Sequence, residues 1–395
     1  MSTETKKGVI SGSLPVILGQ YTDYNFKFTE VEIPNARFVN GRKYPVAIKL
    51  TYTKNNEASD DDSRLYEELA QFVYDLSKDY DTFKTLVRKF GALAIKGFNS
   101  TDPENFSLFV RNFAKGSNLS EFKQNGIAHP REDVAKGGVT TVNKTTGFRR
   151  LYAHQELCRF KTYPSILTFF AKYPSKTGGD ETLTNASELY NVVKQKYPEF
   201  IDAMAKKGIY LTQTWPLGQK LPNGKVYSWK SEHSFGRLIK EGDDLETQKR
   251  KAGEICKKYV SEDYEWTKDG GMKINEHTKP IRLDPYNKEP IIFGSIPSYY
   301  QKYKWNLENI GPNIPPAVTY DNGEQIPLKY LNFILEQSIE LSFDYKFEAG
   351  DIVLVDNYTS YHGRTKYGDQ RREILACFLD DDQQEKKVPI PFVSS

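Results

Sequence analysis

From about residue 138 onward the chain is a succession of short apolar runs, and this pattern limits the possible folds more than any other feature. Many short strands separated by turn residues indicate a β-sandwich or barrel and not a parallel α/β sheet. Three stretches with helical periodicity interrupt the series, at about 185–206, 244–259 and 327–341. The predicted strands are 138–142, 149–157, 164–171, 208–214, 280–283, 290–294, 344–348, 351–356 and 372–379.

The part of the chain before this region mixes strands and helices. Residues 1–50 combine short apolar runs with Pro and Gly and predict strands and turns, and Asn55–Arg64 predicts a polar loop. The run Ala92–Ile95 predicts a buried strand. Apolar residues at helical spacing predict helices at 63–77, 81–90 and 102–114. The whole chain therefore indicates an α+β protein that is mostly β.

We expect one large domain with additions at both ends. Residues 1–60 would pack on the core as strands and turns, residues 61–380 would form the domain, and residues 381–395 would be a C-terminal tail. Pro216–Arg237 is rich in Gly, Pro, Lys and Ser and has little periodicity, which marks it as a candidate lid. It would begin a long insertion, at about 216–340.

Composition and charge exclude several classes of protein. Hydrophobic residues make up 38% and charged residues 27% of the 395 residues, which is typical of a globular chain. The 55 basic and 52 acidic residues lack the basic excess of nucleic-acid-binding proteins. The three cysteines form no CxxC pair, so we expect no disulfide and a reducing, cytoplasmic compartment. No apolar run approaches the roughly 20 residues that a membrane helix requires.

A first candidate site lies in the segment LYAHQEL, residues 151–157. In a strand, residues two apart point to the same face, so His154 and Glu156 would offer an imidazole nitrogen and a carboxylate oxygen to one point. A second histidine would complete the set of two imidazoles and one carboxylate that leaves three positions open on non-haem Fe(II). By itself, this spacing also occurs by chance at surface and packing positions.

A second candidate site lies in FEAGDIVLVDNYTSYHGRT, residues 347–365. Its run Ile352–Val355 predicts a fully buried strand that leads to a polar cluster ending in His362. Arg371 and Arg372 follow, directly before the last predicted strand, so a guanidinium would lie close to this histidine. Arginine can hold a carboxylate through two parallel hydrogen bonds.

A third segment, GGDETLT at 178–184, has two glycines that permit a tight turn. The hydroxyl of Thr182 can then donate a hydrogen bond to an anionic oxygen. In isolation this segment also has the composition of an ordinary turn.

In order and surroundings, the three segments resemble the taurine dioxygenase/TfdA-like family of Fe(II)- and 2-oxoglutarate-dependent oxygenases. That family carries HxD or HxE, a Gly-Gly-(x)-Thr turn, and a GD[IVL][VL]xDN strand that leads to HGR and an Arg-Arg pair. Here the last of these segments is GDIVLVDNYTSYHGRTKYGDQRR, and the likeness spans about residues 60–380. The resemblance implies a double-stranded β-helix core, also called a jelly roll or cupin-like fold, with flanking helices and a long insertion.

The resemblance also implies roles for individual residues. His154, Glu156 and His362 would bind Fe(II). Arg372 would bind the distal carboxylate of the cosubstrate 2-oxoglutarate, and Thr182 would donate a hydrogen bond to the same group. Arg371 would take the place of Arg372 if the alignment shifts by one residue.

Departures from the family pattern bear on the substrate. The acidic ligand is Glu156 where Asp is commoner, and its presence argues against a halogenase. Taurine dioxygenase has an arginine for the sulfonate where this chain has Ala376, so taurine is not the expected substrate. Arg150 and Tyr152 would share the strand face of His154 and contact an anionic substrate. Further basic candidates are Arg131 and Arg364, and the remaining histidines, which we expect to be structural, are His129, His233 and His277.

We therefore expect an oxygenase that consumes O₂, converts 2-oxoglutarate to succinate and CO₂, and abstracts hydrogen from a small polar substrate with a carboxylate or amino-acid group. Hydroxylation, desaturation and oxidative cyclisation all stay open as outcomes. One alternative is a kainoid synthase-like cyclase of an N-prenylated glutamate in specialised metabolism. Two others are a non-catalytic ligand-binding β-helix protein and a zinc hydrolase with the same three ligands. Neither a nucleic-acid nor a membrane partner is expected, and the sequence leaves the oligomeric state open.

Overall fold

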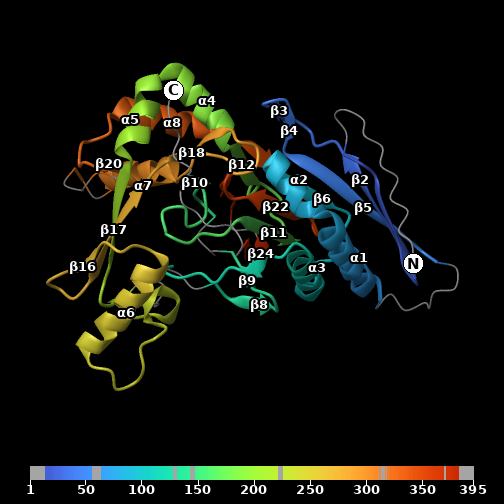
Figure 1. Ribbon diagram of the computed structural model, residues 1–395, viewed down its shortest axis with the longest axis horizontal. Coiled ribbons are helices and arrows are strands. Elements are labelled where there is room, and N and C mark those ends of the chain that lie inside the picture. Colours follow the sequence, from blue (N-terminus) through green and yellow to red (C-terminus); the bar gives the residue numbers. More distant parts are fainter. Residues whose placement is uncertain are drawn as a thin grey trace.

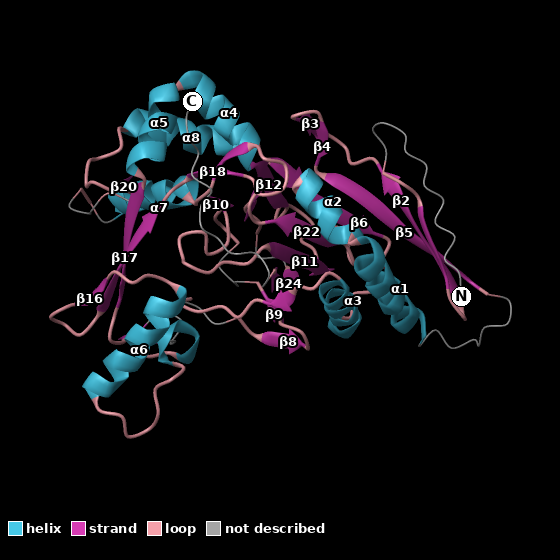
Figure 2. Cartoon of the chain, in the orientation of Figure 1, coloured by secondary structure: helices cyan, strands magenta, loops and turns pink. Residues whose placement is uncertain are grey.

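The computed structural model describes residues 14–55, 64–127, 131–142, 147–220, 226–309, 311–312, 316, 318–368 and 371–381. Two β-sheets form its centre, and helices lie around them (Figure 1). Strands and helices alternate along the chain without segregating into separate halves (Figure 2). The protein is therefore a mixed, sheet-rich α+β fold, as the sequence predicts.

The larger sheet has ten strands in the order β1-β2-β5-β6-β22-β11-β24-β9-β8, with β7 beside β24. Its central strand β22 (Ile352–Asp356) is buried along its whole length and pairs antiparallel with β6 (Ala92–Lys96) and β11 (Ile166–Tyr173). Because both faces of β22 are covered, its apolar residues run continuously instead of alternating. The other strands are β1 (Ile17–Gln20), β2 (Tyr24–Val31), β5 (Val46–Lys54), β7 (Ser120–Glu121), β8 (Asp133–Ala135), β9 (Val139–Thr141) and β24 (Glu373–Asp380).

The N-terminal strands extend the larger sheet. β5 pairs parallel with β6, and β2 and β1 continue the sheet outward from β5. Phe26, Phe72 and Phe83 belong to the apolar cluster that joins this part of the sheet to three helices. These helices are α1 (Leu65–Tyr80), α2 (Thr82–Phe90) and α3 (Pro103–Gly116), and a small hairpin consists of β3 (Arg37–Val39) and β4 (Arg42–Tyr44). Most of the predicted loop Asn55–Arg64 lies outside the described residues.

The smaller sheet has four strands in the order β10-β23-β12-β21. Leu183 and Phe343 of this sheet pack with Phe169, Val353 and Phe378 of the larger sheet in one apolar cluster, so the two sheets face each other. The strands are β10 (Leu151–His154), β12 (Glu181–Asn185), β21 (Phe343–Tyr345) and β23 (Ser360–Arg364). The candidate site lies between the two sheets.

The chain between β12 and β21 forms a helical layer and a further lobe (Figure 1). Helices α4 (Ala186–Lys196), α5 (Pro198–Lys207), α7 (Ile296–Asn309) and α8 (Leu328–Glu340) share an apolar cluster with β10 and β23 of the smaller sheet. The lobe has a four-stranded sheet of β16 (Tyr264–Trp266), β17 (Met272–Thr278), β13 (Ile209–Trp215) and β20 (Thr319–Tyr320). It also contains α6 (Leu245–Tyr259), the π-helical turn η2 (Glu232–Gly236) and the pair β14 (Gln219–Lys220) with β15 (Val226–Tyr227). The pair β18 (Ile281–Leu283) with β19 (Pro290–Ile292) belongs to the apolar cluster of the helical layer.

The structure corrects three local predictions. Residues 185–206 form two helices and not one, because Pro198 cannot continue α4 and instead begins α5. The strand predicted at 149–157 is limited to β10. The predicted polar cluster that contains His362 is strand β23. Helix α7 was not predicted, because its apolar residues lack a clear helical period.

Two expectations from composition can be compared with the structure directly. All three cysteines are buried and free. Within the described ranges, no helix combines the length and the apolar character needed to cross a bilayer.

Candidate metal centre

Three side chains with metal-ligating atoms converge between the two sheets. His154 ends β10, Glu156 follows in the next turn, and His362 is the central residue of β23. One ligand atom from each residue lies within 4.8 Å of the other two. Oε2 of Glu156 is 3.9 Å from Nε2 of His154 and 3.7 Å from Nε2 of His362. The structure therefore brings the three residues together from positions some two hundred residues apart.

The position of Glu156 depends on a turn and not on a strand. The reasoning that His154 and Glu156 share a strand face is wrong, since β10 ends at His154. Instead, the buried side chain of Asn357 holds the turn. Its Oδ1 accepts a hydrogen bond from the Glu156 N–H (2.8 Å), and its Nδ2 donates to the carbonyls of Glu156 (3.0 Å) and Pro164 (2.9 Å). Asn357 is not among the predicted site residues, although it lies within the GDIVLVDN segment.

Hydrogen bonding and burial prepare both imidazoles for metal binding. Nδ1 of His154 lies 2.9 Å from the carbonyl of Tyr152, and a proton on Nδ1 leaves the Nε2 lone pair free. His362 is 5% exposed. Burial, together with the nearby His154 and Arg131, lowers the pKa of His362 well below its ordinary value. His362 can therefore present a neutral nitrogen, and the hydrogen bond at Nδ1 of His154 leaves its Nε2 as the ligand atom.

Arg131 contacts the acidic member of the cluster. Its Nη2 lies 3.4 Å from Oε1 of Glu156, and its guanidinium lies over the ring of Phe378, 4.4 Å from the centroid. Burial lowers the pKa of Arg131, and Glu156 opposes this shift. The arginine thus occupies one oxygen of Glu156 while the other faces the two imidazoles.

The structure separates the two adjacent arginines. Arg371 is exposed, pairs with Glu373 (3.4 Å) and stacks on Tyr173. Arg372 is partly buried, and its Nε donates to the carbonyl of Gly179 (2.9 Å) in the glycine turn. Arg372 is therefore the arginine that faces inward, as the unshifted alignment implies.

Thr182 does not face the arginine. Leu183 is opposite His362 in the register of β12 and β23 and belongs to the cluster between the sheets. Because side chains alternate, Thr182 points to the other face, where its Oγ1 lies against Gly363. The inward residue next to Leu183 on the same face is Glu181, which is not among the predicted site residues. The signal was present, since Glu181 follows GGD directly and Thr182 stands one position later.

The two candidate substrate contacts on the first strand have other surroundings. A register shift between Leu151 and His154 breaks the alternation on which their assignment rested. The guanidinium of Arg150 lies 3.3 Å from Oγ of Ser342 and 3.8 Å from Asp344. Tyr152 packs against the apolar cluster of the helical layer. Arg150 and Tyr152 therefore stay predictions that the geometry does not favour.

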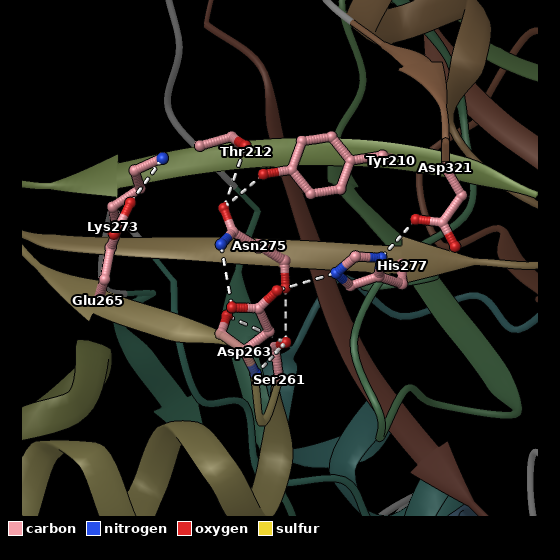
Figure 3. Close-up of polar contacts among 9 residues, drawn as sticks. All are labelled: Tyr210, Thr212, Ser261, Asp263, Glu265, Lys273, Asn275, His277 and Asp321. Atoms are coloured by element: carbon pink, nitrogen blue, oxygen red, sulfur yellow. Dashed lines mark hydrogen bonds and ion pairs between the residues drawn. The ribbon is translucent and has the colours of Figure 1, made fainter. Parts of the chain in front are cut away.

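The other described histidines, His277 and His233, do not belong to the cluster of His154, Glu156 and His362. His277 of β17 lies between two carboxylates in the further lobe, with Nε2 3.0 Å from Asp263 and Nδ1 beside Asp321 (Figure 3). The backbone carbonyl of His233 accepts a hydrogen bond from Ile127. His129 lies outside the described residues.

Comparison with known proteins gives consistent matches. The family model "Taurine catabolism dioxygenase TauD, TfdA family" matches residues 66–378. A clavaminate synthase-like protein of Arabidopsis thaliana is 26% identical over 297 residues, 74% of this chain and 82% of the relative. The dapdiamide synthesis protein DdaC of Enterobacter agglomerans is 21% identical over 291 residues, 71% of this chain and 80% of the relative.

Solved structures also match over most of the chain. PvcB from Pseudomonas aeruginosa covers 90% of this chain and 91% of its own, with 13% identity and a TM-score of 0.43. The match to a taurine dioxygenase from Burkholderia xenovorans covers 85% of this chain and 86% of that protein, with 11% identity and a TM-score of 0.41.

Proposed function

The chain belongs to the taurine catabolism dioxygenase TauD, TfdA family, and on this basis we propose that it is an Fe(II)- and 2-oxoglutarate-dependent oxygenase. His154, Glu156 and His362 would hold the iron. Their donor set supports this assignment, since two neutral imidazoles and one carboxylate suit Fe(II) and leave room for other ligands. The convergence of these three side chains is the observation that carries the proposal.

We propose a double-stranded β-helix as the core. Along the chain, β9, β11, β22 and β24 of the larger sheet alternate with β10, β12, β21 and β23 of the smaller sheet, except that β12 and β21 are consecutive members of the smaller sheet. This alternation between two facing sheets supports the assignment. Within the proposed single domain at 61–380, the chain leaves the smaller sheet after β12 and returns at β21.

The residues around the site have separate tasks in this proposal. Bound iron with 2-oxoglutarate supplies O₂ activation, decarboxylation of the cosubstrate to succinate and CO₂, and abstraction of hydrogen from the substrate. Arg372 would bind the distal carboxylate of the cosubstrate. Asn357 holds the turn of Glu156, and Arg131 orients the carboxylate of that residue. Phe169 and Phe378 provide an apolar wall that excludes water.

We propose a small polar substrate that carries a carboxylate or an amino-acid group. Partly buried cationic side chains near the metal residues, above all Arg131, favour an anionic group. Ala376 lies in the cluster between the sheets and offers no charge for a sulfonate, which argues against taurine. Hydroxylation, desaturation and cyclisation stay open, and a kainoid synthase-like cyclisation of an N-prenylated glutamate is one specific form of this proposal. The match to a dapdiamide synthesis protein supports a place in specialised metabolism.

The test combines spectroscopy with product formation. Without O₂, Fe(II) and 2-oxoglutarate should give a weak visible charge-transfer band with the wild-type protein, and a substrate screen under O₂ should release succinate. His154→Ala and His362→Ala should lose both signals and keep the wild-type circular dichroism spectrum, because each removes one of three metal ligands. His277→Gln, a change in the further lobe, is the matched control and should keep both signals.

The same test separates the alternatives. A zinc hydrolase would show hydrolysis that depends on Zn(II) and no band with 2-oxoglutarate. A non-catalytic binding protein would form no succinate with any substrate of the screen. Either result would contradict the proposed function.

A further inference from the structure

A buried acid lies on the inward face of β12 beside two arginines. Glu181 is 4% exposed and is opposite Arg364 of β23 in the register of the two strands. It is also opposite Tyr345 of β21, whose hydroxyl donates to Asp351 (2.9 Å). Because Glu181 is two residues from Leu183, and Arg364 two residues from His362, the acid and the arginine share the face that contains the metal residues.

Both arginines keep hydrogen-bonding capacity. Arg364 is 5% exposed, and its Nε is buried without a partner among the described residues. Its Nη2 donates to the carbonyl of Arg149 (3.3 Å). Arg372 donates a hydrogen bond through Nε to the carbonyl of Gly179. Among the described residues, Glu181 forms no ion pair with either guanidinium. A buried donor without an acceptor costs free energy, so the unpaired Nε of Arg364 suits an anion bound beside the two arginines.

The environment favours the neutral form of Glu181. Burial raises its pKa to about 8, although Arg372 and Arg364 both act to lower it. The other titratable groups that face this region are Tyr367, which lies beside both guanidiniums, Tyr345 and Asp180. At neutral pH the group is therefore mainly a carboxylic acid, which can donate one hydrogen bond.

We propose that Glu181 is a cosubstrate-binding residue that donates a hydrogen bond, as a neutral acid, to the distal carboxylate of 2-oxoglutarate between Arg364 and Arg372. This inference rests on the proposed function and assigns to Glu181 the part that the family resemblance implied for Thr182. An ionised Glu181 would place a second negative charge against the bound carboxylate. Binding of the cosubstrate is therefore linked to protonation of Glu181.

The expected pH dependence of 2-oxoglutarate binding has a definite direction. The protonated form binds, and its fraction falls about tenfold per pH unit once the pH exceeds the pKa of the free protein. The Kd for 2-oxoglutarate should therefore be constant below about pH 8 and rise by up to about tenfold per pH unit above it. In Glu181→Gln the amide still donates a hydrogen bond but does not titrate, so this rise should disappear.

The experiment measures 2-oxoglutarate binding to the Fe(II) protein without O₂ from pH 6.5 to 9.5, through the charge-transfer band. The ratio of the Kd values of wild type and Glu181→Gln removes any effect of pH on the metal itself. Tyr367→Phe is the matched control for the other titratable side chain beside the arginines, and should retain the rise. Parallel profiles for wild type and Glu181→Gln, or loss of the rise in Tyr367→Phe, would overturn the proposal.

A second measurement needs no variant. Calorimetric titration of the wild-type protein with 2-oxoglutarate at pH 8.5, in two buffers of different ionisation enthalpy, should show uptake of a fraction of a proton. Binding without proton uptake would refute the role of Glu181 and leave the proposed function intact. Absence of any 2-oxoglutarate binding at every pH would instead contradict the proposed function itself.

Discussion

At the scale of single residues, the site consists of two groups of polar side chains, one around Glu156 and one around Glu181. Glu156 faces two imidazoles through one oxygen and Arg131 through the other. Arg364 and Arg372 lie further along the same interior with Glu181. In the proposed function, the interior is therefore divided between a metal-binding end and an anion-binding end.

The two adjacent arginines provide a direct test of this division. Arg372→Ala should raise the KM for 2-oxoglutarate by about 10- to 100-fold, because a charge-assisted hydrogen bond contributes about 1.5–3 kcal/mol. Arg371→Ala should leave it within about twofold, because a contact between exposed charges contributes about 0–1 kcal/mol. Succinate formation against 2-oxoglutarate concentration measures both values. Equal effects of the two changes would show that the inward position of Arg372 has no role in binding.

At the scale of elements, β23 holds the site because it lies between two strands that each bring a functional residue. It pairs with β10, which ends in His154, and with β12, which begins with Glu181. The close approach of these strands requires a glycine in β23. A Cβ at Gly363 would lie 2.4 Å from the carbonyl oxygen of Leu151 and 2.6 Å from Oγ1 of Thr182.

Gly363→Ala should therefore destabilise the protein and weaken metal binding together. The cost expected for such overpacking is about 1–3 kcal/mol in the free energy of unfolding. Gly368→Ala is the matched control, because a Cβ there meets no atom within 4 Å. Chemical denaturation and Fe(II) titration of the two variants check this. A stable Gly363→Ala variant with normal metal affinity would show that the smaller sheet can widen at this point.

In the sheet of the further lobe, a histidine with two carboxylate partners should make stability depend on pH. His277 of β17 is hydrogen-bonded to Asp263, which precedes β16, and to Asp321, which follows β20 (Figure 3). Burial acts to lower the pKa of His277, but the hydrogen bonds to the two carboxylates outweigh it, and the net effect is a raised pKa.

The sign of the effect on stability follows from this raised pKa. The contribution of His277 is complete below its ordinary pKa of about 6.5 and is lost as the pH rises through the higher value of the folded protein. The Tm difference between wild type and His277→Gln should thus be larger at pH 6 than at pH 9. Thermal unfolding at both pH values measures it, and a difference that grows with pH would contradict the assigned link.

At the scale of the whole molecule, the N-terminal strands and the further lobe are both attached to the two central sheets that enclose the site. The N-terminal strands lengthen the larger sheet through the pairing of β5 with β6. In the further lobe, Glu276 of β17 lies 3.3 Å from Arg159, which follows Glu156 by three residues. The lobe is therefore anchored three residues after Glu156, one of the proposed metal ligands.

The N-terminal strands should stabilise the fold without taking part in the chemistry. Phe28 of β2 is 1% exposed and stacks on Phe72 of α1 at 5.7 Å. Phe28→Ala should lower the free energy of unfolding by about 3–5 kcal/mol, the usual cost of such a cavity, and should leave the Kd for Fe(II) unchanged in the folded protein. Leu18→Ala, at a 56% exposed position, should have little effect on stability. A changed metal affinity in Phe28→Ala would indicate coupling between the N-terminal strands and the site.

Patterns among neighbouring residues were enough to predict many of the local elements and the types of residue at the site. The periodicity of α1 and α8, the continuous apolar run of β22 and the histidines of the two motifs are all short-range features. They can be read from neighbouring residues, because helix and strand periods are local properties of the backbone.

Which of these residues face one another depends on strand pairing across the folded chain. The register between β12 and β23 directs Glu181 inward and Thr182 outward, and a turn held by Asn357 places Glu156 beside the two imidazoles. A shift of one residue in a strand moves every side chain to the opposite face, so such choices depend on pairing between distant segments. The same holds for Arg372 and Arg371, which are neighbours in the chain and differ only in the direction that the start of β24 gives them.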